Sequence, residues 1–190
     1  MDHPVLGVLE LNSLAVGVQV MDAMVKMAPV VILDAKIINP GKMVILIRGD
    51  VASVAASLAA GRSSGSGHVV DELFLPNLHE SVLPALRGAV AVDQWDAVGI
   101  IESFSATAGI EAGDAAAKAA EVLITEIRLD PEMGGKSTVK MVGVIDAVEA
   151  AMKAGMDLVK GKGLLCRGIT IPRPDPGIRP FFTGGSGRRG

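Results

Sequence analysis

The sequence predicts an α+β protein made of two tandem domains that share one fold. The 190-residue chain repeats itself once, because residues 97–155 follow the pattern of residues 5–61. A repeat of this length is a domain rather than one turn of a solenoid. Each copy alternates short β-branched runs with helical stretches, in the order strand, helix, strand, strand, helix, strand. This order predicts a ferredoxin-like βαββαβ fold, with helices on one face of a mostly antiparallel sheet.

The two copies keep the same residues at matched positions. The match holds at an offset of 92 residues and resumes, after a two-residue slip, at an offset of 94. The matched pairs are Gly7 and Gly99, Glu10 and Glu102, Ser13 and Ser105, Gly17 and Gly109, Asp22 and Asp114, Lys26 and Lys118, Ala28 and Ala120, Lys42 and Lys136, Gly49 and Gly143, Val54 and Val148, and Gly61 and Gly155. A duplicated domain places pseudo-symmetry inside one chain, and this constrains how chains assemble.

The first copy is expected to contain strands at Val5–Leu11, Val30–Ile38, Met43–Arg48 and Val69–Leu75, and helices at Leu14–Met27, from Asp50 to about Ala60, and near Glu80–Leu86. Asn12 or Ser13 caps the first helix and Asp50 caps the second, because short polar side chains accept the unpaired N–H groups there. Asn39–Lys42 (NPGK) predicts a type II turn whose glycine has positive φ. The glycine- and serine-rich run Gly61–Gly67 predicts a flexible loop.

The second copy follows the same order. Its strands are expected at Val98–Ser103, Val122–Leu129, Thr138–Val144 and Leu164–Ile171, and its helices at Ala106–Ala119 and Asp146–Val159. The turn that matches Asn39–Lys42 is Pro131–Lys136. We therefore place the first domain at residues 1–90 and the second at 91–182. The glycine-rich end, residues 183–190, predicts a disordered tail.

The composition of the chain excludes several classes of function. Hydrophobic residues make up 49% of the chain, yet they are mostly small, and aromatic residues make up 3%. Small domains bury such a surplus poorly on their own, so we expect large interfaces between chains. No apolar run is long enough to cross a membrane, and the N-terminus lacks the pattern of a signal peptide, so a cytosolic protein is expected. A net charge of −3 without basic patches argues against nucleic acid as a partner.

No catalytic or metal-binding constellation is visible, so the chain is not expected to be an enzyme. His3, His68 and His79 lack metal-ligand spacing, and no Ser-His-Asp or Cys-His arrangement occurs. Cys166 is expected to be a small buried hydrophobe. The recurrence of Glu10 at Glu102 follows from the repeat alone and does not indicate a pair of catalytic carboxylates.

Three motifs resemble one known family. The run D-A-x-x-K-x-A occurs at Asp22–Ala28 and again at Asp114–Ala120, each time after a strand that reads GVLE or GIIE. Residues 171–174 read I-P-R-P. Together they resemble the edge motifs of bacterial microcompartment shell domains, over nearly the whole chain and twice. The unpermuted order looks most like the tandem-domain trimeric type of shell protein, in particular the PduT type.

The resemblance implies a homotrimer that forms a six-sided flat disc and tiles with other shell proteins around enclosed enzymes. In the family, the lysine that matches Lys26 and Lys118 packs at the disc edge against a neighbouring disc. The arginine that matches Arg173 inserts into that neighbour. Asn77 stands in this place in the first copy, so the two kinds of edge are expected to differ.

The resemblance also implies a central pore for small metabolites. The expected pore-lining residues are Ile38, Asn39, Pro40, Gly41, Met133, Gly134 and Gly135. The PduT type carries a cysteine in the first pore turn, and three copies bind one iron–sulfur cluster. Asn39 occupies this position here, and an amide is a poor ligand for such a cluster, so no cofactor and no metal are expected. We expect an open polar pore, with backbone N–H groups at Gly134 and Gly135 that attract anions.

Plainer interpretations remain for each of these residues. Asn39 is favoured before Pro-Gly in any turn, lysines such as Lys26 and Lys118 usually lie on a solvated helix face, and Arg173 is equally compatible with a free surface position. Two other functions stay open: an electron-transfer shell protein with a cluster in the pore, and a trimeric ferredoxin-like sensor of a small ligand.

Overall fold

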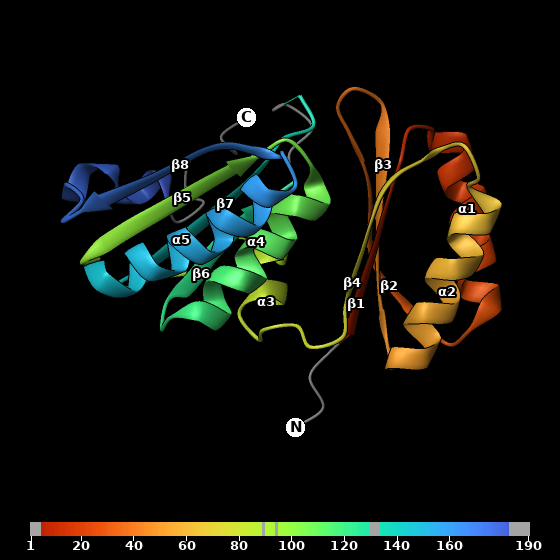
Figure 1. The fold of residues 1–190 in the computed structure, drawn as a ribbon, viewed down its shortest axis with the longest axis horizontal. Helices are drawn as coiled ribbons and strands as arrows, with labels where there is room; N and C mark the ends of the chain where they lie inside the picture. Colours follow the sequence, from red (N-terminus) through yellow and green to blue (C-terminus); the bar gives the residue numbers. More distant parts are fainter. Residues whose placement is uncertain (1–4, 89, 94, 130–133, 183–190) are drawn as a thin grey trace. The chain divides into compact units, whose positions relative to one another are not determined.

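The computed structural model describes residues 5–88, 90–93, 95–129 and 134–182. The chain divides into two compact units (Figure 1). The first unit comprises residues 1–78 together with 130–135, and the second comprises residues 79–129 together with 136–190.

The first unit is a four-stranded antiparallel sheet with two helices on one face (Figure 1). Its elements are β1 (Val5–Leu11), α1 (Leu14–Met27), β2 (Val31–Ile38), β3 (Lys42–Gly49), α2 (Val51–Ser64) and β4 (Val69–Leu75). The strand order is β2-β3-β1-β4, so β3 lies between the two strands that α1 connects. This is the predicted split βαβ arrangement.

The second unit repeats that topology. Its elements are α3 (Val82–Arg87), β5 (Ala97–Ser103), α4 (Ala106–Ala119), β6 (Leu123–Arg128), β7 (Ser137–Gly143), α5 (Ile145–Gly161), β8 (Leu165–Pro172) and the 3-10 helix η2 (Pro176–Phe181). The strand order is β6-β7-β5-β8. Irregularities in the ladders recur at matched places: between Ile32 and Asp34 and between Ile124 and Glu126. The α+β fold predicted from the repeat is confirmed.

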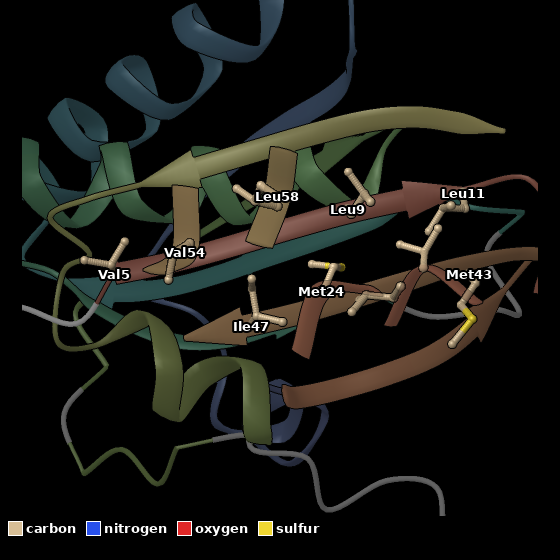
Figure 2. Close-up of a cluster of buried hydrophobic side chains, with 10 residues drawn as sticks. Val5, Leu9, Leu11, Met24, Met43, Ile47, Val54 and Leu58 are labelled. Carbon is tan, nitrogen blue, oxygen red and sulfur yellow. The ribbon is translucent and has the colours of Figure 1, made fainter. Parts of the chain in front are cut away.

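An apolar cluster between sheet and helices forms the core of the first unit (Figure 2). Its buried members are Val5, Leu9, Leu11, Val20, Met24, Met43, Ile45, Ile47, Val54 and Leu58. They come from alternate positions of β1 and β3 and from one face of each helix, as expected where one face of a sheet packs against helices.

Serine rather than asparagine caps the first helix of each copy. The N–H of Val16 donates to Ser13 Oγ at 3.4 Å, and in the second copy the N–H of Ala108 donates to Ser105 Oγ at 3.1 Å. Asp50 caps α2 as predicted, because its Oδ1 accepts the N–H of Ser53 at 2.8 Å.

The flexible loop predicted at Gly61–Gly67 is wrong over its first half. α2 continues to Ser64, and Gly65 follows it as the C-terminal cap. Gly61 is buried inside the helix, where a Cβ atom would lie 2.9 Å from the Cγ of Met24. This glycine therefore permits a close approach between α2 and α1 rather than breaking the helix.

The turn at Asn39 also differs from the prediction. The Asn39–Pro40 peptide bond is cis, and the N–H of Gly41 donates to the carbonyl of Ile38 at 3.0 Å. Pro40 is thus the third residue of the turn, which makes it type VI rather than type II. Gly41 still has the expected positive φ, of 90°.

The segment after each copy is the third difference. α3 was expected to close the first domain, which we placed at residues 1–90, but it packs against β6 and α4 and belongs to the second unit. The unit boundary therefore lies after Leu78. After the second copy the chain forms η2, which the sequence did not predict. Asp175 stands at the start of η2, where its Oδ1 accepts the N–H of Gly177 at 2.7 Å. The tail predicted at 183–190 lies outside the described residues.

Candidate functional site

The turn between β2 and β3 carries the first group of expected pore residues. Asn39, Pro40 and Gly41 are exposed there, whereas Ile38 is buried at the end of β2. The N–H of Gly41 donates to the Ile38 carbonyl and closes the turn, and Asn39 is exposed at its tip. The turn therefore presents the polar side chain of an exposed asparagine at the end of the hairpin.

Gly134 and Gly135 carry the second group, and both have positive φ, of 65° and 82°. Gly135 is buried in the first unit against the backbone of Asn39: a Cβ atom at Gly135 would lie 2.5 Å from the Asn39 carbonyl oxygen. Only glycine fits this close approach and this conformation. The structure thus brings Asn39 and Gly135 together. Met133 lies outside the described residues.

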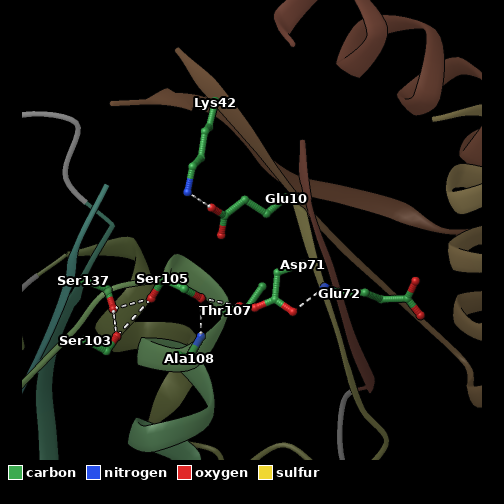
Figure 3. A network of polar contacts seen from close by, with 9 residues as sticks. All are labelled: Glu10, Lys42, Asp71, Glu72, Ser103, Ser105, Thr107, Ala108 and Ser137. Carbon is green, nitrogen blue, oxygen red and sulfur yellow. Dashed lines mark hydrogen bonds and ion pairs between the residues drawn. The ribbon is translucent and has the colours of Figure 1, made fainter. Parts of the chain in front are cut away.

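The lysines beside the first turn are neutralised. Lys42 Nζ lies 2.7 Å from Glu10 Oε1, and the Glu10 side chain is fully buried (Figure 3). Lys36 pairs with Asp34 at 2.8 Å. In the second copy, Lys136 instead lies 5.7 Å above the ring of Phe104. The repeated glutamate therefore has a structural partner in the first copy, which agrees with its interpretation as a product of the repeat.

The residues of this chain do not fit an iron–sulfur cluster at the turn. Such a cluster is held by thiolates, and Asn39 offers an amide. Cys166 lies on β8, half-buried rather than fully buried as expected, with its Sγ 3.7 Å from Glu102 Oε2. Within the described residues, no group of three or more His, Cys, Asp or Glu side chains is placed to hold a metal ion.

Lys26 and Lys118, the lysines expected at the edge, pair with matched aspartates but have different surroundings. Lys26 pairs with Asp22 at 2.6 Å, and the Asp22 side chain is 59% exposed. Lys118 pairs with Asp114 at 2.5 Å, but the Asp114 side chain is 6% exposed. The difference arises partly because Asp114 Oδ1 also accepts the N–H of His79, from the segment that leads into α3.

Arg173 and Asn77 each follow the last strand of their copy and are exposed. Arg173 has a left-handed backbone, with φ of 47°, and its N–H donates to the carbonyl of Asp96 at 2.6 Å. Among the described non-glycine residues, Arg173 is the only one with positive φ. The two matched residues therefore direct the chain differently.

A buried hydroxyl cluster was not predicted from the sequence. Ser103 Oγ and Ser137 Oγ are 2.6 Å apart, and they lie 3.0 and 2.8 Å from the carbonyl oxygen of Ser105, so two hydroxyl protons are shared among three contacts (Figure 3). The matched residues of the first copy, Leu11 and Met43, are apolar. An alignment of the copies shows this exchange, but only contacts reveal that the hydroxyl groups satisfy one another.

His68 and His79 serve local structure, and His3 lies outside the described residues. His68 Nδ1 is 2.8 Å from Asn12 Oδ1, and His79 Nδ1 is 2.9 Å from Ser81 Oγ. Neither histidine is joined to a nucleophile and a carboxylate in the way a catalytic triad requires. No helix of the described residues has the length and apolarity needed to span a lipid bilayer.

Comparison with known proteins gives consistent matches. The BMC domain family matches residues 5–78 and again residues 97–174. The bacterial microcompartment shell protein PduT of Citrobacter freundii is 41% identical over 169 residues, which cover 89% of this chain and 92% of that protein.

Two solved structures are similar as well. The crystal structure of a microcompartment protein from Desulfitobacterium hafniense DCB superposes with a TM-score of 0.86 at 40% identity, over 93% of this chain and 98% of that one. A fused permuted hexameric shell protein of the RMM microcompartment has a TM-score of 0.60 at 20% identity, over 83% of this chain and 84% of the other. The second similarity concerns the fold alone.

Proposed function

The chain belongs to the BMC-domain family of bacterial microcompartment shell proteins, and from that premise we propose that three copies form a pseudohexameric disc with a central pore. The chain supplies two of these domains, so three chains supply six. A ring of this kind closes on itself because each domain meets its neighbour through the same pair of surfaces. The relatives reported above are named as shell or microcompartment proteins, which supports a structural rather than a catalytic role.

The observation that carries this proposal is the difference between the first helices of the two copies. Val18 on α1 is 53% exposed, whereas the matched Ile110 on α4 is fully buried. The same holds for Leu14 and the matched Ala106. Like domains bury like surfaces in a pseudo-symmetric ring, so the apolar face of α1 requires a second copy to cover it.

We place the hairpin tips at the axis of this ring. Asn39 is exposed at its tip, Gly135 packs against it, and the adjacent lysines 36 and 42 are paired with carboxylates. The group left to face the opening is an uncharged amide that both donates and accepts hydrogen bonds. A ring of such amides suits the passage of small polar metabolites. It does not suit an iron–sulfur cluster, so the electron-transfer alternative has no support from these residues; stoichiometric iron after anaerobic purification would reverse that conclusion.

We place Lys26, Lys118 and Arg173 at the edges where discs meet. Lys26 and Arg173 are exposed, and a guanidinium donates well to backbone carbonyl oxygens of a neighbouring disc. Asn77 in place of the second arginine makes alternate edges chemically different. Neighbouring discs of this or another shell protein therefore meet two kinds of edge.

Native mass measurement and electron microscopy test the proposal together. The wild-type chain should be a trimer in dilute solution and should form flat sheets when concentrated. The double variant Lys26→Glu, Arg173→Glu should remain a trimer but lose the sheets, because like charges then face each other at the edges.

Lys153→Glu is a matched control, since Lys153 is an exposed helix lysine that also pairs with an aspartate four residues away. This control should keep both trimers and sheets. A wild-type monomer would contradict the proposed ring, and loss of the trimer in the double variant would contradict the edge assignment.

A further inference from the structure

The segments that follow the two copies are related in sequence but occupy different places. At an offset of 96 residues, Asn77 matches Arg173, Val82 matches Ile178, and Pro84 matches Pro180. α3 is therefore the counterpart of η2. Matched segments of a duplicated domain are expected to pack on matched surfaces, so any departure requires a physical reason.

α3 lies beside the first helix and the edge strand of the second unit. It packs against α4 and β6 through its buried residues Val82 and Ala85. The segment that leads into it donates the N–H of His79 to Asp114 Oδ1 at 2.8 Å. The chain that follows donates the N–H of Val90 to the carbonyl of Thr125 on β6, at 2.8 Å.

η2 packs instead on the sheet of its own unit. Phe182 is buried with Val98 and Val142, and Ile178 and Trp95 pack against this cluster. The rings of Trp95 and Phe182 meet edge to face, with centroids 5.6 Å apart, and Lys140 Nζ lies 5.6 Å from the Phe182 ring. The segment therefore packs on β5 and β7 at a site that we call its aromatic seat.

On α1 and β2, which match the two elements that α3 packs against, apolar residues are exposed. Ile37 on β2 is exposed, whereas the matched Leu129 is buried. Val25 on α1 is exposed, whereas the matched Ala117 is buried. In the described part of the chain, Asp22 has Lys26 as its partner, so the carboxylate oxygen that matches the one bound by His79 accepts no hydrogen bond.

The two segments take different directions from one matched position, Asn77 in the first copy and Arg173 in the second. Arg173 has a φ of 47°, whereas Asn77 does not have positive φ. Left-handed backbone is unfavourable for an arginine and far more tolerable for an asparagine, yet the arginine is the residue that adopts it. Arg173 therefore adopts an unfavourable φ, and the direction of η2 is maintained by the Arg173–Asp96 backbone hydrogen bond and by the packing of Phe182 in the aromatic seat.

We propose that the segment Asp175–Phe182 has a second seat, on α1 and β2 of a second copy of this chain. There it covers the surface that α3 covers within the second unit. The N–H of Asp175 takes the role of His79 and donates to the Asp22 carboxylate of the other copy. Ile178 takes the place of Val82. This inference rests on the proposed trimer, since only an assembled ring brings the C-terminal segment of one chain to α1 of another.

Cross-linking between two differently marked chains tests this exchange. In a Cys166→Ala background, one chain carries Asp22→Cys and the other Asp175→Cys, and the two are co-expressed and treated with a short bis-maleimide. A covalent pair of unlike chains is expected. The matched control carries His79→Cys and Asp114→Cys in one chain, and it should cross-link within that chain, because His79 and Asp114 are hydrogen-bonded there.

A second variant keeps the test independent of cysteine placement. Arg173→Gly removes the conformational cost of the left-handed backbone and should hold the segment on its own sheet, which lowers the yield of cross-linked pairs. A trimer without cross-links between chains, alongside a positive control, would overturn this inference and leave the proposed function standing. A chain that remains a monomer would overturn both.

Discussion

The two domains have the same backbone fold, but the side chains beneath the first helix differ in chemistry at one close contact with the sheet. In the first unit, Met43 fills the space beneath Gly17 on α1, and Leu11 is its paired residue on β1. In the second unit, Ser137 and Ser103 stand at the matched places beneath Gly109. A Cβ atom on either glycine would overlap the side chain below it, so both helices approach their sheets equally closely.

This difference shows two ways to stabilise one close contact between a helix and a sheet. Met43 contributes buried apolar volume and dispersion contacts. The serines contribute a closed set of hydrogen bonds in which Ser103 and Ser137 both use the Ser105 carbonyl. Buried hydroxyl groups are tolerated here only because each has a partner.

Truncation of the two matched side chains should have very different effects. Met43→Ala should lower the free energy of unfolding by about 3 kcal/mol, because it leaves a cavity in a closed core. Ser137→Ala should cost only about 1 kcal/mol, since the Ser103 hydroxyl keeps the Ser105 carbonyl as its acceptor. Urea unfolding followed by far-ultraviolet circular dichroism measures both.

The emission of Trp95 adds a control in the same experiment. Trp95 is the only tryptophan and lies in the second unit, so its transition reports on that unit. Ser137→Ala should shift this transition directly. Equal losses from Met43→Ala and Ser137→Ala would show that the two copies are stabilised in the same way at this position.

Charge reversal at the two matched lysines should sharpen the comparison. Lys118→Glu should destabilise the fold by about 1–2 kcal/mol, because it removes the cation from a largely buried Asp114 and adds a second carboxylate. Lys26→Glu should change stability by less than about 0.5 kcal/mol, because both partners are exposed. Denaturant midpoints at low ionic strength compare them. A larger loss from Lys26→Glu would contradict the burial difference at this pair.

The caps of the second helices should give the smallest effects. Two hydrogen bonds from Ser53 hold the pKa of Asp50 below its ordinary value of 3.8. The stability conferred by ionised Asp50 is therefore present above that pH and is lost as the pH falls through the lowered pKa. Asp50→Ala should be less stable than wild type near neutral pH and should approach it in acid.

α5 offers the opposite change. Val144 stands at its N-cap position without a side-chain hydrogen bond, and Asp96 bonds the N–H of Ile145 at 3.2 Å instead. Val144→Asp should raise stability by about 0.5–1 kcal/mol near neutral pH. Thermal unfolding from pH 3 to pH 7 follows both cap variants, and a Val144→Asp variant that is less stable at pH 7 would contradict the cap assignment.

Local patterns in the sequence were sufficient for the elements. Short β-branched runs together with cap and turn residues predicted the strands and helices to within a few residues, and the repeat predicted that both sheets share one order. The errors occurred where a distant contact decides the conformation. Gly61 marks a loop by its type but is helical because Met24 lies against it. The seat of α3 depends on α4 and β6, which its own residues do not specify.

The candidate site shows the same division. The sequence located the turn at Asn39 and the matched positions of Lys26 and Lys118, because these depend on local motifs, whereas the ion pairs of both lysines with aspartates were not predicted. The burial of Asp114, the glycine contact at Asn39 and the left-handed Arg173 depend on segments far along the chain. Periodicity carries no information about such contacts, so only the structure could supply them.

The turn of the second copy is two residues longer than the matched turn of the first, yet β1 and β3 pair in the same register as β5 and β7. Leu11 faces Met43 in the first sheet, and Ser103 faces Ser137 in the second. Turn length and strand register are therefore independent in this fold. In the proposed ring, residues inserted into one turn alone would narrow the opening at three alternate positions, a change that a ring of six identical subunits does not allow.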